Sequence, residues 1–264
     1  MTNPIDTLFN ERNATRLMTH VVAGDPDLES SLDLAERMAR SGADLIEIQI
    51  PFSDPLADGP TIMASNQKAL DNGTRPEDCF KMIRRLRERV SVPLLVMTYA
   101  NIPYRRGGKR FAGECAAAGA SGVIIPDLPW DEPLPGLRDA LRNRGIHFIH
   151  LVSPGMSDDR LKTVLGLASG FLYLTLRVGT TGAASGIEPR GLEFLRKVKS
   201  LTRLPVAAGF GVSAPDQVKR LKGRVEAVII GSHLINLRRG QGVEAVESFL
   251  HLCKSSGNGR PRPE

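Results

Sequence analysis

The sequence has few cysteines and no long hydrophobic run. Its three cysteines, Cys79, Cys115 and Cys253, lie far apart without CxxC spacing, which argues against a disulfide framework or a zinc site and indicates a reducing compartment. No stretch approaches the ~18 apolar residues that a membrane helix needs. The N-terminus also has no apolar segment of the kind found in signal peptides. These absences favour a cytoplasmic protein with no membrane partner.

Aromatic residues are also scarce, at 5% of the 264 residues. The net charge of +6 comes from lysines and arginines at helical spacing, as in KMIRRLRERV (81–90). A nucleic-acid-binding face would interleave basic and aromatic side chains, so no nucleic-acid partner is expected. A general attraction for an anionic small molecule is compatible with this charge.

What the sequence does contain is a repeated alternation of short β-branched runs with amphipathic helical stretches. Helical patterns such as 28–42 end at a glycine, where a left-handed cap is favoured. Strands that alternate with helices imply parallel βαβ units, and eight units in ~250 residues imply closure into a (β/α)8 TIM barrel of the α/β class. An open doubly wound sheet is the alternative, but the glycine fingerprint after its first strand is absent. The expected strands are 16–23, 44–50, 93–99, 122–127, 147–152, 171–177, 204–210 and 227–232.

Further features complete the expected fold. Residues 4–12 are expected to form an extra N-terminal helix across the bottom of the barrel, and SHLINL (232–237) a short extra helix after the last strand. No domain boundary is visible, so residues 1–256 are expected to form a single barrel domain. The polar, Gly- and Pro-rich residues 257–264 are expected to be a disordered tail.

A carboxylate lies inside the second expected strand, in the stretch EIQIPFSDPLADGP (47–60). With a period of two, the isoleucines of this strand face the helices, and Glu47 and Gln49 face the barrel lumen. An ionised carboxylate in an apolar interior is costly unless it is paired, so a buried salt bridge is one interpretation. The position of Glu47 near the carboxyl end of its strand, where barrel active sites lie, favours a functional role.

The loop after this strand is stiffened by Pro51, Pro55 and Pro60 and carries Asp54 and Asp58. Prolines fix backbone angles and lower the entropic cost of ordering a loop. For Asp54, an Asx turn is as good an interpretation as function. Asp58 is positioned either to cap the helix that starts near Pro60 or to act in catalysis.

Glycine-containing loops follow the last three expected strands, at 177–186, 209–213 and 231–235. Backbone N–H groups at such glycines bind phosphate, especially where a helix begins. In barrels the usual phosphate site combines the loops after strands seven and eight with a short extra helix. The sequence therefore predicts a phosphate site there, with the loop 177–186 as a lid over it.

The sequence lacks the residues that several other types of catalysis require. The sixth expected strand has no lysine for a Schiff base, and no GxSxG nucleophile elbow is present. His147 and His150 are three residues apart in an expected strand, so they face opposite sides and do not have metal-ligand spacing. We therefore expect acid–base catalysis by carboxylates on a phosphorylated substrate, without metal or cofactor.

The stretch EIQIPFSDPLADGP resembles the first signature of the tryptophan synthase alpha chain family, a Glu-x-Gly-Ile-Pro-Phe-Ser-Asp-Pro-x-Ala-Asp-Gly-Pro pattern. This motif is long and specific, and shorter matches follow in family order over nearly the whole chain. They are VAGDPD (22–27), MTYAN (97–101), PDLP (126–129), RVGTTG (177–182) and GFGVS (209–213).

The resemblance implies cleavage of indole-3-glycerol phosphate to indole and glyceraldehyde 3-phosphate, with Glu47 and Asp58 as the catalytic pair. It implies no cofactor, and a beta chain as partner in an α2β2 assembly. Tyr173 is expected to point toward the substrate, although an aromatic core filler is an equally good interpretation. The substrate-binding residues that the resemblance implies are Tyr99, Asp127, Tyr173, Thr181, Gly182, Phe210, Gly211, Gly231 and Ser232.

The chain departs from the family pattern in four places, one of which is Leu176, which replaces a usual small hydroxyl residue before Arg177. Gln49 replaces a usual glycine and is expected to crowd the indole or to hydrogen-bond Glu47. His20 replaces a usual aromatic in the indole pocket, and the segment 101–111 (NIPYRRGGKRF) is more basic than in typical relatives, where it faces the beta chain. Four functions stay open: an alpha subunit with a partner, a stand-alone lyase, a relative with another phosphorylated substrate, and a non-catalytic phosphate-ligand-binding subunit.

Overall fold

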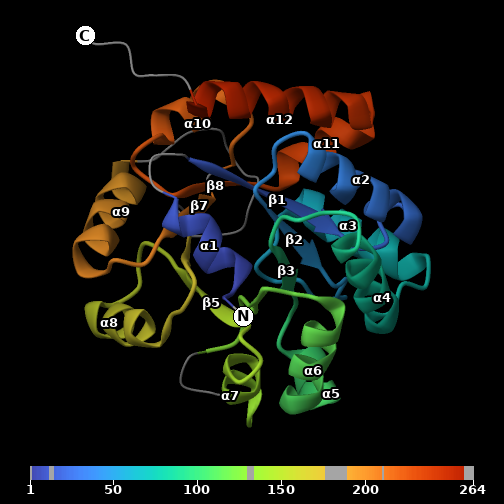
Figure 1. Cartoon of the computed structure of the whole chain (residues 1–264), viewed down its shortest axis with the longest axis horizontal. Coiled ribbons are helices and arrows are strands. Elements are labelled where there is room, and N and C mark those ends of the chain that lie inside the picture. Colours follow the sequence, from blue (N-terminus) through green and yellow to red (C-terminus); the bar gives the residue numbers. More distant parts are fainter. Residues whose placement is uncertain (1, 12–14, 130–133, 176–188, 210, 259–264) are drawn as a thin grey trace.

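The computed structural model describes residues 2–11, 15–129, 134–175, 189–209 and 211–258. Eight parallel strands pair in chain order and close into a barrel, with β8 hydrogen-bonded to β1 (Figure 1). The barrel prediction is therefore confirmed, and the open-sheet alternative was wrong. The strands are β1 (Arg16–Val22), β2 (Leu45–Gln49), β3 (Leu94–Met97), β4 (Gly122–Ile124), β5 (His147–Val152), β6 (Leu172–Thr175), β7 (Val206–Gly209) and β8 (Ala227–Ile230).

Helices connect successive strands and form a ring around the barrel (Figure 1). Their starts follow helix-entry signals: proline occupies the first turn of α3, α4 and α10, and the Asp27 side chain caps α2 by accepting from the Ser30 amide. The helices are α1 (Pro4–Asn10), α2 (Leu28–Arg40), α3 (Pro60–Asp71), α4 (Pro76–Arg87), α5 (Asn101–Arg106), α6 (Gly108–Ala118), α7 (Leu137–Arg142), α8 (Asp158–Leu167), α9 (Pro189–Leu201), α10 (Pro215–Leu221), α11 (Ser232–Gln241) and α12 (Val243–Asn258).

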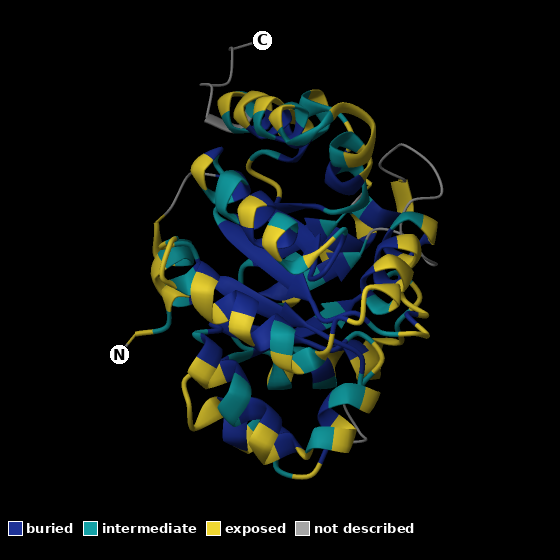
Figure 2. Ribbon diagram, turned by 90° about the vertical axis from the view of Figure 1, so that its right-hand side faces the viewer, coloured by how far each residue is buried: buried dark blue, intermediate teal, exposed yellow. Residues whose placement is uncertain are grey.

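The alternation of side chains along the strands divides the core into two regions. Ile46, Ile48 and Ile50 belong to the large apolar cluster between strands and helices, whereas Leu45 belongs to the smaller cluster in the lumen. Figure 2 shows the strands as a buried centre, with the exposed residues on the outer sides of the helices. The predicted face assignment of β2 is confirmed, and it turns Glu47 inward.

Helix α1 lies across one end of the barrel, as predicted (Figure 1). Its Ile5 is fully buried within the lumen cluster, and Phe9 packs on Phe171 with ring centroids 5.6 Å apart. Asp6 of the same helix contacts His147 of β5, with Oδ1 2.9 Å from Nε2. The helix therefore closes the end opposite to the carboxyl ends of the strands and leaves the other end for a site.

The C-terminal part has two helices after β8. Helix α11 starts at Ser232, directly after β8, and is the predicted extra helix, although at 10 residues it is longer than expected. Helix α12 continues to Asn258, two residues past the expected domain end at 256, and the remainder of the predicted tail lies outside the described residues. No helix in the described part of the chain is long and apolar enough to cross a membrane.

Candidate active site

Glu47 lies in the lumen, at the middle of β2. It is 3% exposed, and its Cα partner in the β1–β2 register is His20. The two side chains form a contact in which His20 Nδ1 lies 3.5 Å from Glu47 Oε2. The buried ion pair that the sequence left open is thus present, but its partner is a histidine, which can itself exchange a proton near neutral pH.

Asp58 reaches the same region from the β2–α3 loop and is 5% exposed. The side-chain amide of Gln49 donates to Asp58 Oδ2 at 2.8 Å and to Asn66 Oδ1 at 3.3 Å. The N-cap of α3 is Gly59, without a side-chain cap hydrogen bond, so Asp58 does not cap the helix. The expectation that Gln49 hydrogen-bonds Glu47 was wrong, because its amide is directed to the other carboxylate.

The electrostatics of these groups follow from burial in a shared lumen. Burial raises the pKa of Asp58 above its usual value, while the hydrogen bond from Gln49 and the nearby His20 oppose that rise. For His20, burial acts to lower the pKa, but the charge of Glu47 and the contact with it outweigh burial, so the pKa is raised. Protons are therefore held in this cluster to higher pH than free side chains would hold them.

Two tyrosines line the site. Tyr99 is 1% exposed and stacks on Phe52 with ring centroids 5.4 Å apart, and its hydroxyl accepts from the Ala57 amide at 3.2 Å. Tyr173 on β6 packs against the lumen cluster, and its pKa is raised well above the usual value by burial and by Glu47 and Asp58. Burial and the neighbouring Asp58 likewise raise the pKa of Tyr99, so both tyrosines face the carboxylates.

Asp127 and Asp54 lie further out. Asp127 is exposed, its Oδ1 accepts from the Ala100 amide at 2.8 Å, and partial desolvation raises its pKa. It thereby joins the loops that follow β3 and β4. Asp54 is exposed in the β2–α3 loop and accepts from the Ser53 hydroxyl, so its side chain is not part of the lumen cluster.

The predicted anion site lies at the ends of β7 and β8. Gly211 has a φ of +63°, a conformation that favours glycine, and Gly231 is the N-cap of α11. At a helix start the first amides, here those of Ser232 and His233, have no preceding carbonyl of the helix to bond and can bind an anion. The Leu234 amide, by contrast, already donates to the Gly231 carbonyl at 2.9 Å. In the loop 209–213, the Ser213 amide donates to Gln217 Oε1 at 2.7 Å and serves the start of α10.

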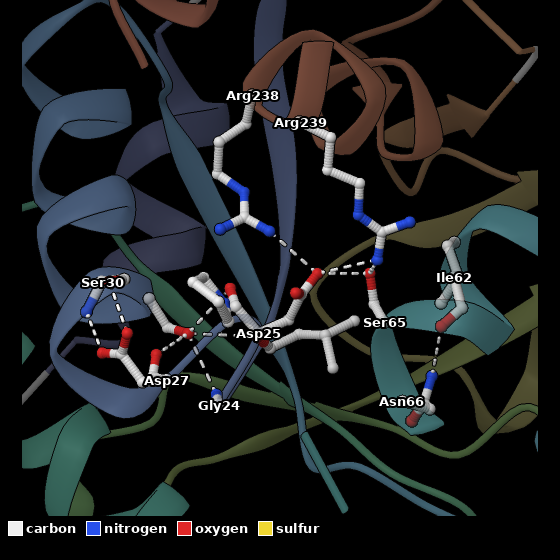
Figure 3. A network of polar contacts seen from close by, with 12 residues as sticks. Gly24, Asp25, Asp27, Ser30, Ile62, Ser65, Asn66, Arg238 and Arg239 are labelled. Atoms are coloured by element: carbon white, nitrogen blue, oxygen red, sulfur yellow. Dashed lines mark hydrogen bonds and ion pairs between the residues drawn. The ribbon is translucent and has the colours of Figure 1, made fainter. Parts of the chain in front are cut away.

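Helix α11 is fixed to the site by a carboxylate that sequence reasoning did not single out. Asp25, 3% exposed at the end of β1, contacts Arg238 Nη2 at 3.0 Å and Arg239 Nη2 at 3.1 Å through Oδ2 (Figure 3). The hydroxyl of Ser65 on α3 donates to the same oxygen at 2.6 Å. An aspartate placed directly after a strand, in the motif 22–27, was the signal that could have indicated this role. We call Asp25, Ser65, Arg238 and Arg239 the Asp25 cluster.

The structure thus brings together most of the predicted site residues. Around one end of the lumen lie Glu47, Asp58, Tyr99, Tyr173, Gly211, Gly231 and Ser232, with Asp127 at the neighbouring loops. Thr181, Gly182 and Phe210 lie outside the described residues. Asn66 and the pairing of His20 with Glu47 were not anticipated, since both contacts depend on how loops and strands meet.

Comparisons with known proteins agree with this architecture. The family model "Tryptophan synthase alpha chain" matches residues 7–253. The tryptophan synthase alpha chain of Desulforapulum autotrophicum is 38% identical over 234 residues, which are 89% of this chain and 92% of that protein. That of Carboxydothermus hydrogenoformans is 40% identical over 226 residues, 86% of this chain and 84% of that one.

Solved structures show the same likeness in three dimensions. A chain of Mycobacterium tuberculosis tryptophan synthase is similar with a TM-score of 0.91 and 29% identity, covering 98% of this chain and 100% of that chain. The alpha chain from Legionella pneumophila gives a TM-score of 0.86 at 27% identity, with 97% of both chains covered. With a family model that spans almost its whole length and relatives that share more than a third of its residues, the chain belongs to the tryptophan synthase alpha chain family.

Proposed function

We propose that Glu47 and Asp58 are the acid–base pair with which this chain cleaves indole-3-glycerol phosphate. As a member of the tryptophan synthase alpha chain family, the chain is a carbon–carbon lyase of tryptophan biosynthesis. The observation that carries the residue assignment is the presence of two carboxylates, 3% and 5% exposed, at one mouth of the lumen. A protein that only bound a ligand would gain nothing from the cost of burying them.

The chemistry requires protons at two places. Breaking the bond between indole C3 and the glycerol chain needs C3 protonated, so that the ring can accept the electron pair of that bond. In our proposal Glu47 delivers a proton to C3 and Asp58 takes the proton of the indole N–H. Glu47 then removes the proton of the glycerol hydroxyl, and the carbonyl of glyceraldehyde 3-phosphate forms as the C–C bond breaks. Asp58 returns its proton to the ring nitrogen, so indole regains its aromaticity with no net proton consumed.

We propose that positioning of the substrate supplies the part of the rate enhancement that acid–base catalysis does not. General acid–base catalysis contributes ~10²–10⁴-fold, and holding both ends of the substrate contributes through orientation. We propose that the amides at Gly211, Gly231 and Ser232 bind the phosphate, with Thr181 and Gly182 contributing from the lid. Tyr99, Tyr173, Asp127 and Phe210 complete the proposed substrate contacts.

We also propose that the chain acts as an alpha subunit with a beta chain. Two large side chains are exposed at the mouth that carries the site: Leu56 of the β2–α3 loop, at 81%, and Tyr104 of α5, at 72%. The basic segment 101–111 carries less free charge than its composition suggests, because Arg106 Nε pairs with Glu114 at 2.6 Å. A cytoplasmic location belongs to the same proposal and agrees with the free, buried cysteines.

The test of the catalytic pair is indole release from indole-3-glycerol phosphate. We expect Glu47→Gln and Asp58→Asn each to lower kcat by ~10²-fold or more, whereas Glu88→Gln, a change at an exposed carboxylate after α4, should leave kcat unchanged. Phosphate binding without turnover in the unaltered chain would contradict the lyase and favour the non-catalytic alternative.

The partner is tested by the same assay with and without a beta chain. If the mouth is the interface, the beta chain raises kcat, and Leu56→Asp together with Tyr104→Asp removes that increase. Leu201→Asp, at a leucine 46% exposed at the end of α9, is the matched control. Full activity of the isolated chain, with no response to a beta chain, would support a stand-alone lyase.

A further inference from the structure

We infer that His20 shares the catalytic proton with Glu47, so that the acid of the cleavage is a Glu47–His20 pair and His20 is a positioning residue that acts through the carboxylate. This inference rests on the catalytic role proposed for Glu47. It assigns a function to a histidine at a position where the family usually has an aromatic residue, and it concerns how the proton is supplied during the reaction.

The geometry places the two groups in direct contact with little solvent. His20 and Glu47 are Cα partners on adjacent parallel strands, and both side chains point into the lumen. His20 Nδ1 lies 3.5 Å from Glu47 Oε2, and the two side chains are 6% and 4% exposed. At such burial the attraction between an imidazolium and a carboxylate is screened only weakly.

In the described part of the chain, each side chain has one buried polar atom without a hydrogen-bond partner. Among the described residues His20 Nε2 and Glu47 Oε2 have no hydrogen-bond partner, and both atoms are buried. An unpaired buried polar atom costs ~1–3 kcal/mol, so a fold without a use for these atoms would be expected to pair or replace them. Unpaired atoms beside a reacting substrate are, by contrast, what proton transfer needs.

The charged groups around His20 all favour its protonated form. On β2 and its loop these are Glu47 and Asp58, with the amide of Gln49 beside them. On the β8 side, Gly231 contributes no side chain, and a Cβ there would meet His20 Cβ at 3.5 Å. On β6, burial and the two carboxylates raise the pKa of Tyr173 well above its usual value, so this phenol stays uncharged.

Two arginines of α11, the helix that follows β8, are already paired with another carboxylate. Arg238 and Arg239 of α11 are both held by the carboxylate of Asp25. A phosphate bound at the start of α11 would add a further negative charge close to His20. Two carboxylates and one imidazole therefore share protons in a pocket without a free positive group in the described part.

The proton balance of the reaction then runs through the pair. Between turnovers the pair holds one proton, as imidazolium and carboxylate. The proton moves from Nδ1 to Oε2 and on to indole C3, which leaves a neutral imidazole and a carboxylate, while Asp58 takes the indole proton. The carboxylate then accepts the glycerol hydroxyl proton and passes it back to His20, and Asp58 returns its proton to the indole nitrogen, so the pair and Asp58 are both restored without any other reactant.

The pH dependence of kcat/KM tests the inference. His20→Asn keeps a donor close to the position of Nδ1 but cannot become charged, and His20→Phe removes donor and charge together. Because a coupled pair titrates as a unit, both variants should lose activity on the alkaline side at lower pH than the unaltered chain, by about one pH unit or more. An alkaline limb unchanged in His20→Asn would overturn the inference.

A second measurement does not depend on turnover. The NMR titration of the His20 Cε1 proton, identified among five histidines by its absence in His20→Asn, should have a midpoint above 6.5. Glu47→Gln should lower that midpoint, since it removes the charge that stabilises the imidazolium. A midpoint that Glu47→Gln does not move would refute the pair, whereas full activity of Glu47→Gln would refute the catalytic assignment on which it rests.

Discussion

The Asp25 cluster is predicted to hold the proposed phosphate-binding helix against the catalytic side of the barrel. Asp25 Oδ2 is contacted by Arg238 and Arg239 of α11 and by Ser65 of α3. One oxygen atom thereby fixes the helix whose start is proposed to bind phosphate and the helix that follows Asp58. Changing Asp25 to alanine should therefore affect both stability and substrate binding.

The magnitude follows from burial. Removing one partner of a buried ion pair costs ~3–5 kcal/mol because the other charge is left uncompensated. The side chains of Arg238 and Arg239 are 15% and 33% exposed, so water can partly solvate them after the change. We expect Asp25→Ala to lower the free energy of unfolding by ~2–4 kcal/mol, which corresponds to roughly 4–16 °C in Tm for a chain of this size.

Urea denaturation followed by circular dichroism measures the stability, and initial rates of indole release give KM and kcat. KM should rise more than kcat falls, because the phosphate is held equally in the ground and transition states. The matched control is Asp33→Ala on α2. Its carboxylate accepts from Arg37 Nε at 2.9 Å, but the two side chains are 58% and 37% exposed, so a loss below ~1 kcal/mol is expected.

A result in which Asp25→Ala loses no more stability than Asp33→Ala would refute the reasoning about the cluster. Asp25→Asn separates charge from volume, because asparagine keeps the size of the side chain and loses the charge. If Asp25→Asn were as stable as the unaltered chain, packing and not the ion pairs would hold α11 in place.

Three further predictions concern single sites. Gly108→Ala on α6 should destabilise the fold by ~1–3 kcal/mol, because a Cβ there would lie 2.9 Å from Leu137 Cβ. Gly113→Ala on the same helix should stabilise the fold by ~0.5–1 kcal/mol, because its Cβ would meet nothing closer than 3.9 Å. Urea denaturation measures both changes. Asp58→Asn should be more stable than the unaltered chain at neutral pH, because burial raises the folded-state pKa of Asp58 above 3.8. This stability advantage is fully present above the folded-state pKa and vanishes below about 3.8, the usual value. Unfolding curves with no pH-dependent difference between the two proteins would contradict it. Gln49→Glu replaces the amide that donates to Asp58 with a second carboxylate and should lower kcat/KM about tenfold or more, while an unchanged value would show that the 2.8 Å hydrogen bond is not used.

The barrel and the inward orientation of Glu47 could be read from local patterns. The spacing of β-branched runs predicted all eight strands, and the period of two along β2 predicted which face Leu45, Glu47 and Gln49 share. The N-terminal helix was predicted from residues 4–12, and the structure shows its Ile5 inside the lumen cluster. These features depend on backbone geometry that repeats within a few residues.

The pairing of polar side chains could not be read in the same way. Gln49 was expected to affect Glu47, two residues away on the same face, but its amide donates to Asp58 in the following loop. His20 was expected to line the indole pocket, and the register between β1 and β2 places it opposite Glu47. Which residues meet across strands depends on the register of the closed barrel.

By itself the sequence determined the alternation of strands and helices, the faces of the strands and the family motifs, because each of these depends on residues that are close together along the chain. Only the tertiary structure decided which charges neutralise one another. Asp25 and Arg239 are 214 positions apart, and they meet because barrel closure brings β8, and the helix after it, beside β1. Hydrophobic periodicity acts over a few residues, whereas electrostatic partners are chosen by where the closed fold places them.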